Sequence, residues 1–236
     1  MLLDNKAHGK VGDVLVDAIG KDAQLSILTN LFSVFGFAAL QKQLNAAASL
    51  RLLLPGDLKP GQAPALFHLA GLAGDESERQ FRNALDLSVV ARACAECLDR
   101  KAEIRAVSSV VPQNLFHIAG ASGTATAIQG SSPLTPSGLG IVPSSRFEMN
   151  TCFRTSEETA ALLGWFDSLW NNAELVRDVK DQVLAQLREI YDNKSPEMIY
   201  FLILYGIFRD FLGELDEDKI IKTRTGIKNT LVWNKL

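Results

Sequence analysis

The sequence is poor in cysteine and contains no long hydrophobic run. Three cysteines among 236 residues cannot all pair, and this scarcity in a chain of ordinary domain size excludes a disulfide-stabilised scaffold. No apolar run reaches the roughly 18–20 residues that a membrane-spanning helix needs, since the longest covers only Met198–Leu204. Residues Met1–Lys6 lack the apolar core of a signal peptide. We therefore expect a cytoplasmic protein with no membrane partner.

An excess of positive charge is also absent. The chain carries 24 Lys and Arg against 27 Asp and Glu, a net charge of −3. This excludes a strongly basic nucleic-acid coat but is compatible with a local basic groove. Hydrophobic residues make up 47% and charged residues 22%, which excludes a disordered or fibrous chain. The length suits one domain with an appendage, or two small domains.

The first part of the chain alternates between helical and strand patterns. Apolar residues at positions 11, 14, 15, 18 and 19 have helical spacing, and Gln24–Leu31 has the β-branched and apolar content of a buried strand. Helix formers fill Phe35–Ala48, and a short strand, Leu50–Leu54, stops at Pro55-Gly56. This alternation favours an α/β sheet covered by helices.

The middle of the chain predicts one more helix and four more strands. Residues 55–80 hold three prolines and four glycines, and we interpret most of them as an irregular insertion. The pattern then predicts a helix over Leu85–Lys101 and strands over Glu103–Val111, Leu115–Ala119, Thr124–Gln129 and Phe147–Phe153.

The composition changes at Thr155, where a helix-capping residue precedes two glutamates. The sequence beyond this point predicts three helices, over Glu157–Trp170, Glu174–Tyr191 and Pro196–Leu215. The sequence thus predicts an α/β domain over 1–154, a helical appendage over 155–215 and a linker or tail over 216–236.

The stretch between His117 and Asn150 is the most informative about function. His117 stands on one predicted strand, Gly130-Ser131-Ser132 follows the next, and Glu148-Met149-Asn150 belongs to the last. This arrangement resembles the half-site of the phospholipase D superfamily, whose pattern is His-x-Lys, an aspartate and then Gly-Ser-x-Asn. Further segments resemble one subgroup, the N-terminal module of bacterial superfamily 2 helicases linked to phage defence or restriction: Leu3-Asp4-Asn5, Leu25–Phe35, Ala91–Arg105 and 165–184.

The resemblance implies a phospholipase D-like mixed sheet flanked by helices, and metal-independent phosphodiester hydrolysis of the nuclease type without a cofactor. It implies that His117 acts as nucleophile or acid, that Ser131 donates to the phosphate and that Glu148 orients the histidine. The phosphate would also be bound by Ser132, Thr135 and Asn150. Such chemistry needs a group that titrates near neutral pH and donors around the phosphate.

Partners follow from the same resemblance. A chain with a single motif must form a homodimer to bring two half-sites together. Nucleic acid, and DNA in particular, is the implied substrate. A helicase domain would follow in the full-length protein.

The sequence departs from the family pattern at three positions. Ala119 replaces the lysine, Thr124 stands where the aspartate would fall, and Pro133 replaces the asparagine. Loss of one such phosphate donor typically costs about 10²–10³ in rate, so we expect weakened or absent activity. One alternative is a catalytically inactive dimerisation and DNA-positioning module. A second is a hydrolase of a small phosphodiester or lipid head group, against which the lack of an amphipathic membrane segment counts.

Other candidate residues favour structural roles. His117 itself is as compatible with a structural strand position as with catalysis. His8-Gly9-Lys10 spells His-x-Lys but precedes a helix, so we interpret it as an exposed N-terminal segment. Cys94 and Cys97 lie inside an amphipathic helix with no second pair nearby, which favours core packing over a metal site. The aromatic stripe Trp165–Trp170 favours helix packing over base stacking.

Overall fold

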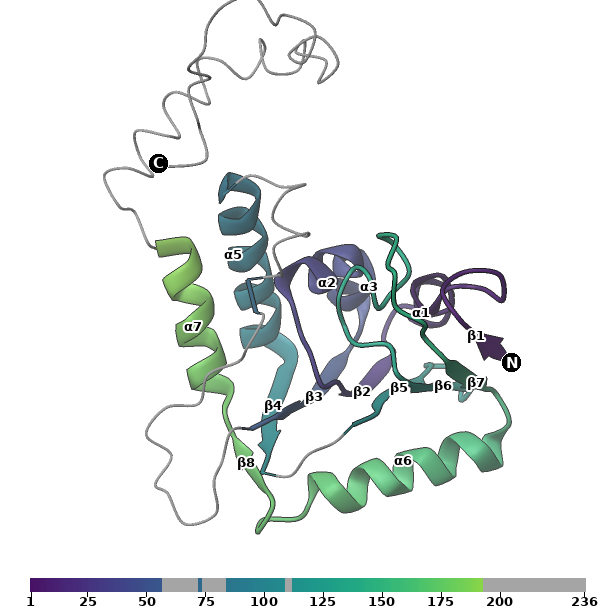
Figure 1. The fold of residues 1–236 in the computed structure, drawn as a ribbon. Helices are drawn as coiled ribbons and strands as arrows, with labels where there is room; N and C mark the ends of the chain where they lie inside the picture. Colours follow the sequence, from purple (N-terminus) through teal and green to yellow (C-terminus); the bar gives the residue numbers. More distant parts are fainter. Residues whose placement is uncertain (57–71, 74–83, 109–111, 193–236) are drawn as a thin grey trace, which may run out of the picture. The chain divides into compact units, whose positions relative to one another are not determined.

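The computed structural model describes residues 1–56, 72–73, 84–108 and 112–192 (Figure 1). Most of the predicted insertion, the predicted helix Pro196–Leu215 and the predicted tail over 216–236 lie outside the described residues. Residues Met1–Asn193 form one compact unit, and this unit carries every predicted site residue.

A single mixed sheet of eight strands forms the centre of this unit, in the order β1-β7-β6-β5-β2-β3-β4-β8. Three neighbouring strands are parallel, and every other pairing is antiparallel. The parallel strands are β2 (Gln24–Leu28), β3 (Ser49–Pro55) and β4 (Ala102–Val107). The others are β1 (Leu2–Leu3), β5 (Asn114–Ala119), β6 (Ala125–Gly130), β7 (Asn150–Phe153) and β8 (Val176–Asp178).

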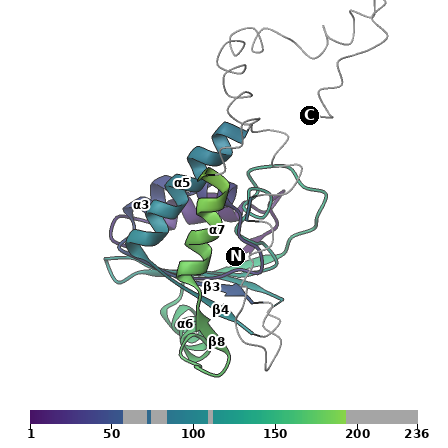
Figure 2. The same ribbon diagram turned by 90° about the vertical axis from the view of Figure 1, so that its left-hand side faces the viewer.

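Helices cover both faces of the sheet, so the unit has three layers (Figures 1 and 2). One face carries α1 (Val11–Ala18), α2 (Val34–Ala39), α3 (Gln41–Ala46), α5 (Ala84–Lys101) and α7 (Lys180–Asp192). The opposite face carries α6 (Ser156–Trp170). The predicted α/β class, with a mixed sheet flanked by helices, is confirmed.

Two hydrophobic clusters correspond to the two faces. The larger lies under α1, α2, α5 and α7 and includes Phe35, Phe116 and Ile128. The smaller lies under α6, where Phe166 and Trp170 pack against side chains of β2, β3, β4 and β5. The aromatic stripe therefore serves helix-to-sheet packing as predicted, although Trp165 keeps 50% of its surface exposed.

The helix predicted over Phe35–Ala48 is divided in two. Leu40 separates α2 from α3 with a non-helical backbone (φ −113°, ψ 13°) while its side chain stays fully buried. Ser33 begins α2 as its N-cap, since its hydroxyl accepts a hydrogen bond from Gly36 N. A break at one residue leaves the apolar periodicity on both sides intact, and the sequence pattern therefore did not reveal it.

The region after residue 155 is part of the sheet domain as far as the structure describes it, whereas the sequence predicted a helical appendage there. The N-cap at Thr155 is confirmed, because its hydroxyl accepts a hydrogen bond from Glu158 N. The first part of the helix predicted over Glu174–Tyr191 is not helical but forms strand β8, which pairs antiparallel with β4 at the sheet edge. The helix itself, α7, begins at Lys180. Strand β8 has only three residues, two of them charged and exposed, so it carries little of the apolar alternation that marks a strand.

Candidate functional site

The Gly130-Ser131-Ser132 motif begins the loop that leaves β6 on the side of α1 and α2. Ser131 lies exposed at its start, where its hydroxyl donates to Glu148 Oε2 at 2.5 Å and accepts from Met149 N at 3.0 Å. Two of the predicted catalytic residues, Ser131 and Glu148, are thus brought together. Both lie at the end of the sheet, since Gly130 pairs with Asn150 in the β6–β7 register.

Ser132 and Asn150 form a buried polar pair directly beneath this point. Ser132 N donates to Asn150 Oδ1 at 3.0 Å, and Asn150 Nδ2 donates back to Ser132 Oγ at 2.9 Å. Asn150 Nδ2 also lies 3.3 Å from the carbonyl oxygen of Leu3. Two of the three residues predicted to bind phosphate are thus close together, but their hydrogen-bonding groups are used within the fold.

Asn5 joins this pair to the N-terminal segment. Its amide nitrogen donates to Ser132 Oγ at 3.1 Å and to Gly138 O at 2.7 Å, while its amide oxygen accepts from Val11 N, the first residue of α1, at 2.9 Å. Asn5 has a left-handed backbone (φ 60°), a conformation that asparagine tolerates better than most residues. Asn5 therefore links the buried Ser132–Asn150 pair to the first residue of α1.

Thr135 continues the same buried loop in a structural role. Its hydroxyl accepts from Gly138 N at 3.1 Å, which closes a turn. The preceding residue, Leu134, is fixed to the end of β2 by a hydrogen bond from its N–H to Thr29 Oγ1. A Cβ on Gly36 would lie only 2.2 Å from Leu134 O, so α2 and the loop are in direct backbone contact.

His117 lies on the opposite face of the sheet, under α6. It pairs with Ser26 on β2 and Ala127 on β6, in the middle of β5. Only 3% of its surface is exposed. Burial is the main cause that lowers the pKa of the imidazole below its ordinary value, and the positive charge of Arg51 lowers it further, while Asp167 acts against both.

Arg51 organises the polar groups around His117. Its guanidinium donates to Ser26 Oγ at 2.8 and 3.2 Å and to Asp167 Oδ1 at 2.7 Å. It also lies over the rings of Phe166 and Trp170, with centroid distances of 5.1 and 5.7 Å. The cation beside His117 is therefore already held by a carboxylate, a hydroxyl and two aromatic rings. No local pattern marks Arg51 for this role, because its partners Asp167 and Ser26 lie 116 and 25 residues away in the sequence.

The predicted catalytic set is therefore divided between two places. Ser131 lies with Glu148, and Ser132 with Asn150, at the end of β6 and β7. His117 shares its face with Leu115 and Gln129, and its charged neighbours are Arg51 and Asp167. The structure does not bring the imidazole and the serines to one concavity.

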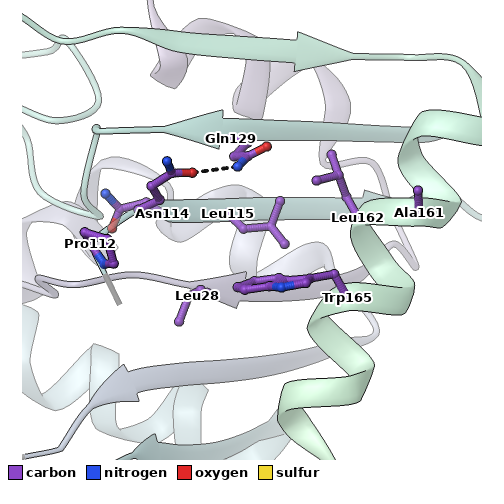
Figure 3. Close-up of a pocket in the computed structure, with 9 residues that line it drawn as sticks. Leu28, Pro112, Asn114, Leu115, Gln129, Ala161, Leu162 and Trp165 are labelled. Atoms are coloured by element: carbon purple, nitrogen blue, oxygen red, sulfur yellow. Dashed lines mark hydrogen bonds between the residues drawn. The ribbon is translucent and has the colours of Figure 1, made fainter. Parts of the chain in front are cut away.

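A cavity of about 380 Å³ lies between the sheet and α6, close to the start of β5 (Figure 3). Trp165 and Leu162 of α6 cover it from one side, and Leu28 and Leu115 form its floor. At its rim Gln129 Nε2 donates to Gln113 Oε1 at 2.6 Å. His117 is not among its lining residues, so the cavity gives no access to the imidazole.

A second hollow, of about 240 Å³, lies between the N-terminal turn and the segment 137–148. Lys6, Lys10 and Arg146 line it together with Asp4 and Glu148. His8, exposed as the sequence predicted, places its Nδ1 2.6 Å from Asp4 Oδ2, and this hydrogen bond is the main cause that holds the pKa of Asp4 well below its usual range. Sequence reasoning missed this basic cluster because its members come from segments 136 residues or more apart.

Cys94 and Cys97 are buried in the core under α5, and burial raises the pKa of both thiols. Within the described ranges no group of three His, Cys, Asp or Glu side chains is arranged to hold a metal ion. In the same part of the chain no helix is both long and apolar enough to cross a bilayer.

Comparison with known proteins gives a limited result. No protein-family model and no curated protein matches the chain. Among solved structures the chain is similar to the phosphatidylserine synthase of Haemophilus influenzae Rd KW20, with 14% sequence identity and a TM-score of 0.43. The alignment covers 90% of this chain but 46% of that one, so this chain spans less than half the length of the synthase. A likeness of this degree assigns neither a family nor an activity.

The hydrogen bonds of Asn5 predict a measurable contribution to stability. Asn5→Ala removes three hydrogen bonds and places alanine at positive φ, so we expect the free energy of unfolding to fall by about 2–3 kcal/mol. Asn5→Gly keeps the backbone conformation and should recover about 1 kcal/mol of this loss. Urea unfolding checks both. Asp22→Ala, at the other positive-φ residue (φ 62°), is the matched control, and an equal loss there would contradict a role for the Asn5 amide.

The lowered pKa of His117 predicts a pH-dependent stability. Below pH 6.5, the ordinary value for histidine, the unfolded chain binds a proton that the folded chain does not. The free energy of unfolding should therefore decrease as the pH falls from 6.5 to the lower pKa of the folded state. Urea unfolding of wild type and His117→Gln between pH 7.5 and 5 measures this as a difference curve. A flat curve would show that the imidazole titrates normally.

Proposed function

We propose that this chain is a phospholipase D-like module that binds nucleic acid and has lost the phosphodiesterase reaction. The observation that carries this proposal is the position of His117, which is buried under α6 on the face opposite the Ser132–Asn150 pair. It favours the inactive dimerisation and DNA-positioning module over an impaired nuclease.

Phosphodiester hydrolysis requires an arrangement of groups that His117 and its neighbours do not provide. A nucleophilic imidazole must reach the phosphorus atom, and cations or N–H donors must surround the non-bridging oxygens. His117 is 3% exposed, and Ala119 occupies the position of the family's lysine on the same strand face. The nearest cation, Arg51, is bound to Asp167 and Ser26. No group in this set is free to bind a phosphate.

The loop that begins at Gly130-Ser131-Ser132, which we call the serine loop, supports the same conclusion from the other face of the sheet. Ser132 uses its N–H and its hydroxyl within the Asn5–Asn150 cluster, and Ser131 uses its hydroxyl with Glu148 and Met149. A phosphate would have to displace these hydrogen bonds, at a cost of roughly 1–3 kcal/mol for each buried group left unsatisfied. The loop therefore fixes the N-terminus to the sheet in place of binding substrate.

Three further parts of this proposal follow the sequence resemblance. The module acts as a homodimer, its ligand is DNA, and it works in the cytoplasm beside a helicase in phage defence or restriction. These parts stand on the motifs quoted above and are independent of the loss of the reaction.

A nicking assay tests the proposal. Supercoiled plasmid incubated in EDTA with the wild-type chain should stay intact, and Ala119→Lys should not restore nicking, because His117 remains buried. A mobility-shift assay on the same samples should show DNA retained by protein, and light scattering should give the mass of a dimer. Nicking that disappears in His117→Ala would establish a nuclease instead, and a monomer would contradict the dimer.

A further inference from the structure

The second hollow has basic and aromatic side chains at its rim, and none of these was predicted as a site residue. We define the basic rim as Lys6, Lys10, Arg146 and Phe147. All four side chains are exposed, and Phe147 has 91% of its surface in solvent. The ammonium of Lys6 lies 4.2 Å from the centroid of the Phe147 ring. Basic and aromatic groups thus occur together at one place on a chain whose net charge is −3.

The positive charge of the basic rim is offset only in part by its neighbours. Within the described ranges no carboxylate lies within 4.0 Å of the charged nitrogens of Lys6, Lys10 or Arg146. Asp4 accepts hydrogen bonds from Lys6 N and His8 N and pairs with the His8 ring, and Glu148 accepts from Ser131. Both carboxylates also line the hollow and keep their negative charges, so the three cations exceed them by one positive charge, and none of the three cations is held in an ion pair with them.

The backbone beneath the basic rim is fixed before any ligand arrives. The N-terminal turn is closed by Asn5 N donating to Gly9 O at 3.0 Å and by the bonds to the Asp4 carboxylate. A Cβ on Gly140 would lie 2.9 Å from Asn5 Oδ1, so the two walls of the hollow are in contact at its base. A preorganised site loses less conformational entropy on binding.

We propose that the basic rim binds single-stranded nucleic acid, with phosphates at Lys6, Lys10 and Arg146 and a base stacked on Phe147. The hollow of about 240 Å³ is below the roughly 300–1,000 Å³ of pockets that enclose a drug-sized ligand, and it suits a segment of backbone. A base in a duplex is already stacked on both sides, whereas an unpaired base can use the open face of Phe147. This inference rests on the proposed nucleic-acid binding and names its site.

A second copy of the chain is the competing occupant, because Met149 and Ile141, 71% and 51% exposed, lie near the basic rim. A twofold interface would place the three cations of one copy against the same patch of the other. Lysine is also depleted from protein interfaces. The charges therefore favour a polyanion.

Fluorescence anisotropy of the full chain, with labelled (dT)20 and a 20-base-pair duplex in EDTA, tests the site. Phe147→Ala should weaken binding of (dT)20 by about 5- to 150-fold and leave duplex binding unchanged, while Phe147→Trp should retain affinity. Lys6→Gln, Lys10→Gln and Arg146→Gln should each reduce the slope of log affinity against log salt by about 0.7. Lys21→Gln and Val89→Ala, at other exposed positions, should behave as wild type.

The outcomes separate the two proposals. If the wild type binds neither probe, the proposed nucleic-acid function fails. If it binds (dT)20 but Phe147→Ala matches Val89→Ala, the function stands and the basic rim is not the site. If Phe147→Ala dissociates a dimer in light scattering without changing affinity, the patch is a self-interface and the inference is overturned.

Discussion

Side chains on successive residues of a strand point to opposite faces of the sheet, and this alternation decides what the candidate residues can do. His117 lies opposite Ser26 and Ala127 in the register of β5, which directs it to α6. Asn150 lies opposite Gly130 and is directed to the face of α1. The β6 end and the middle of β5 are neighbours in the sheet, but their functional groups lie in separate environments.

The environment under α6 is organised to hold a cation and not a phosphate. Arg51 lies over the stacked rings of Phe166 and Trp170 and is only partly exposed, so an unpaired charge there would be costly. Asp167 and Ser26 satisfy its N–H groups at 2.7–3.2 Å. The same cation, together with burial, favours the neutral form of His117. The pair Arg51–Asp167 thus holds α6 to the sheet, while burial and the charge of Arg51 lower the pKa of the imidazole against the opposing effect of Asp167.

The sequence predicted those elements whose hydrophobic pattern is long enough to be periodic. The predicted limits of α1, α5, α6 and the central strands lie close to the observed ones. The prediction missed the break at Leu40 and the strand β8, because a change over one or three residues leaves no periodic pattern. In the site, it grouped Ser131 with Glu148 and Ser132 with Asn150, because β6 and β7 are adjacent and joined by the motif loop. The face of His117 depended on α6, 39 residues later, and no local pattern specifies which face a distant helix covers.

The Gly130-Ser131-Ser132 motif has a structural role that is independent of any reaction. Ser132 and Asn150 contact Asn5 and Leu3, so they hold the N-terminal strand and the start of α1 on the sheet. Replacing either residue would leave buried polar groups unsatisfied, whether or not the protein hydrolyses anything. The demands of folding are therefore enough to account for these side chains, and the Gly-Ser motif does not by itself indicate an activity. The cations at which we propose that phosphate binds, Lys6, Lys10 and Arg146, are exposed instead, and in the part of the chain that the structure describes no carboxylate forms an ion pair with them.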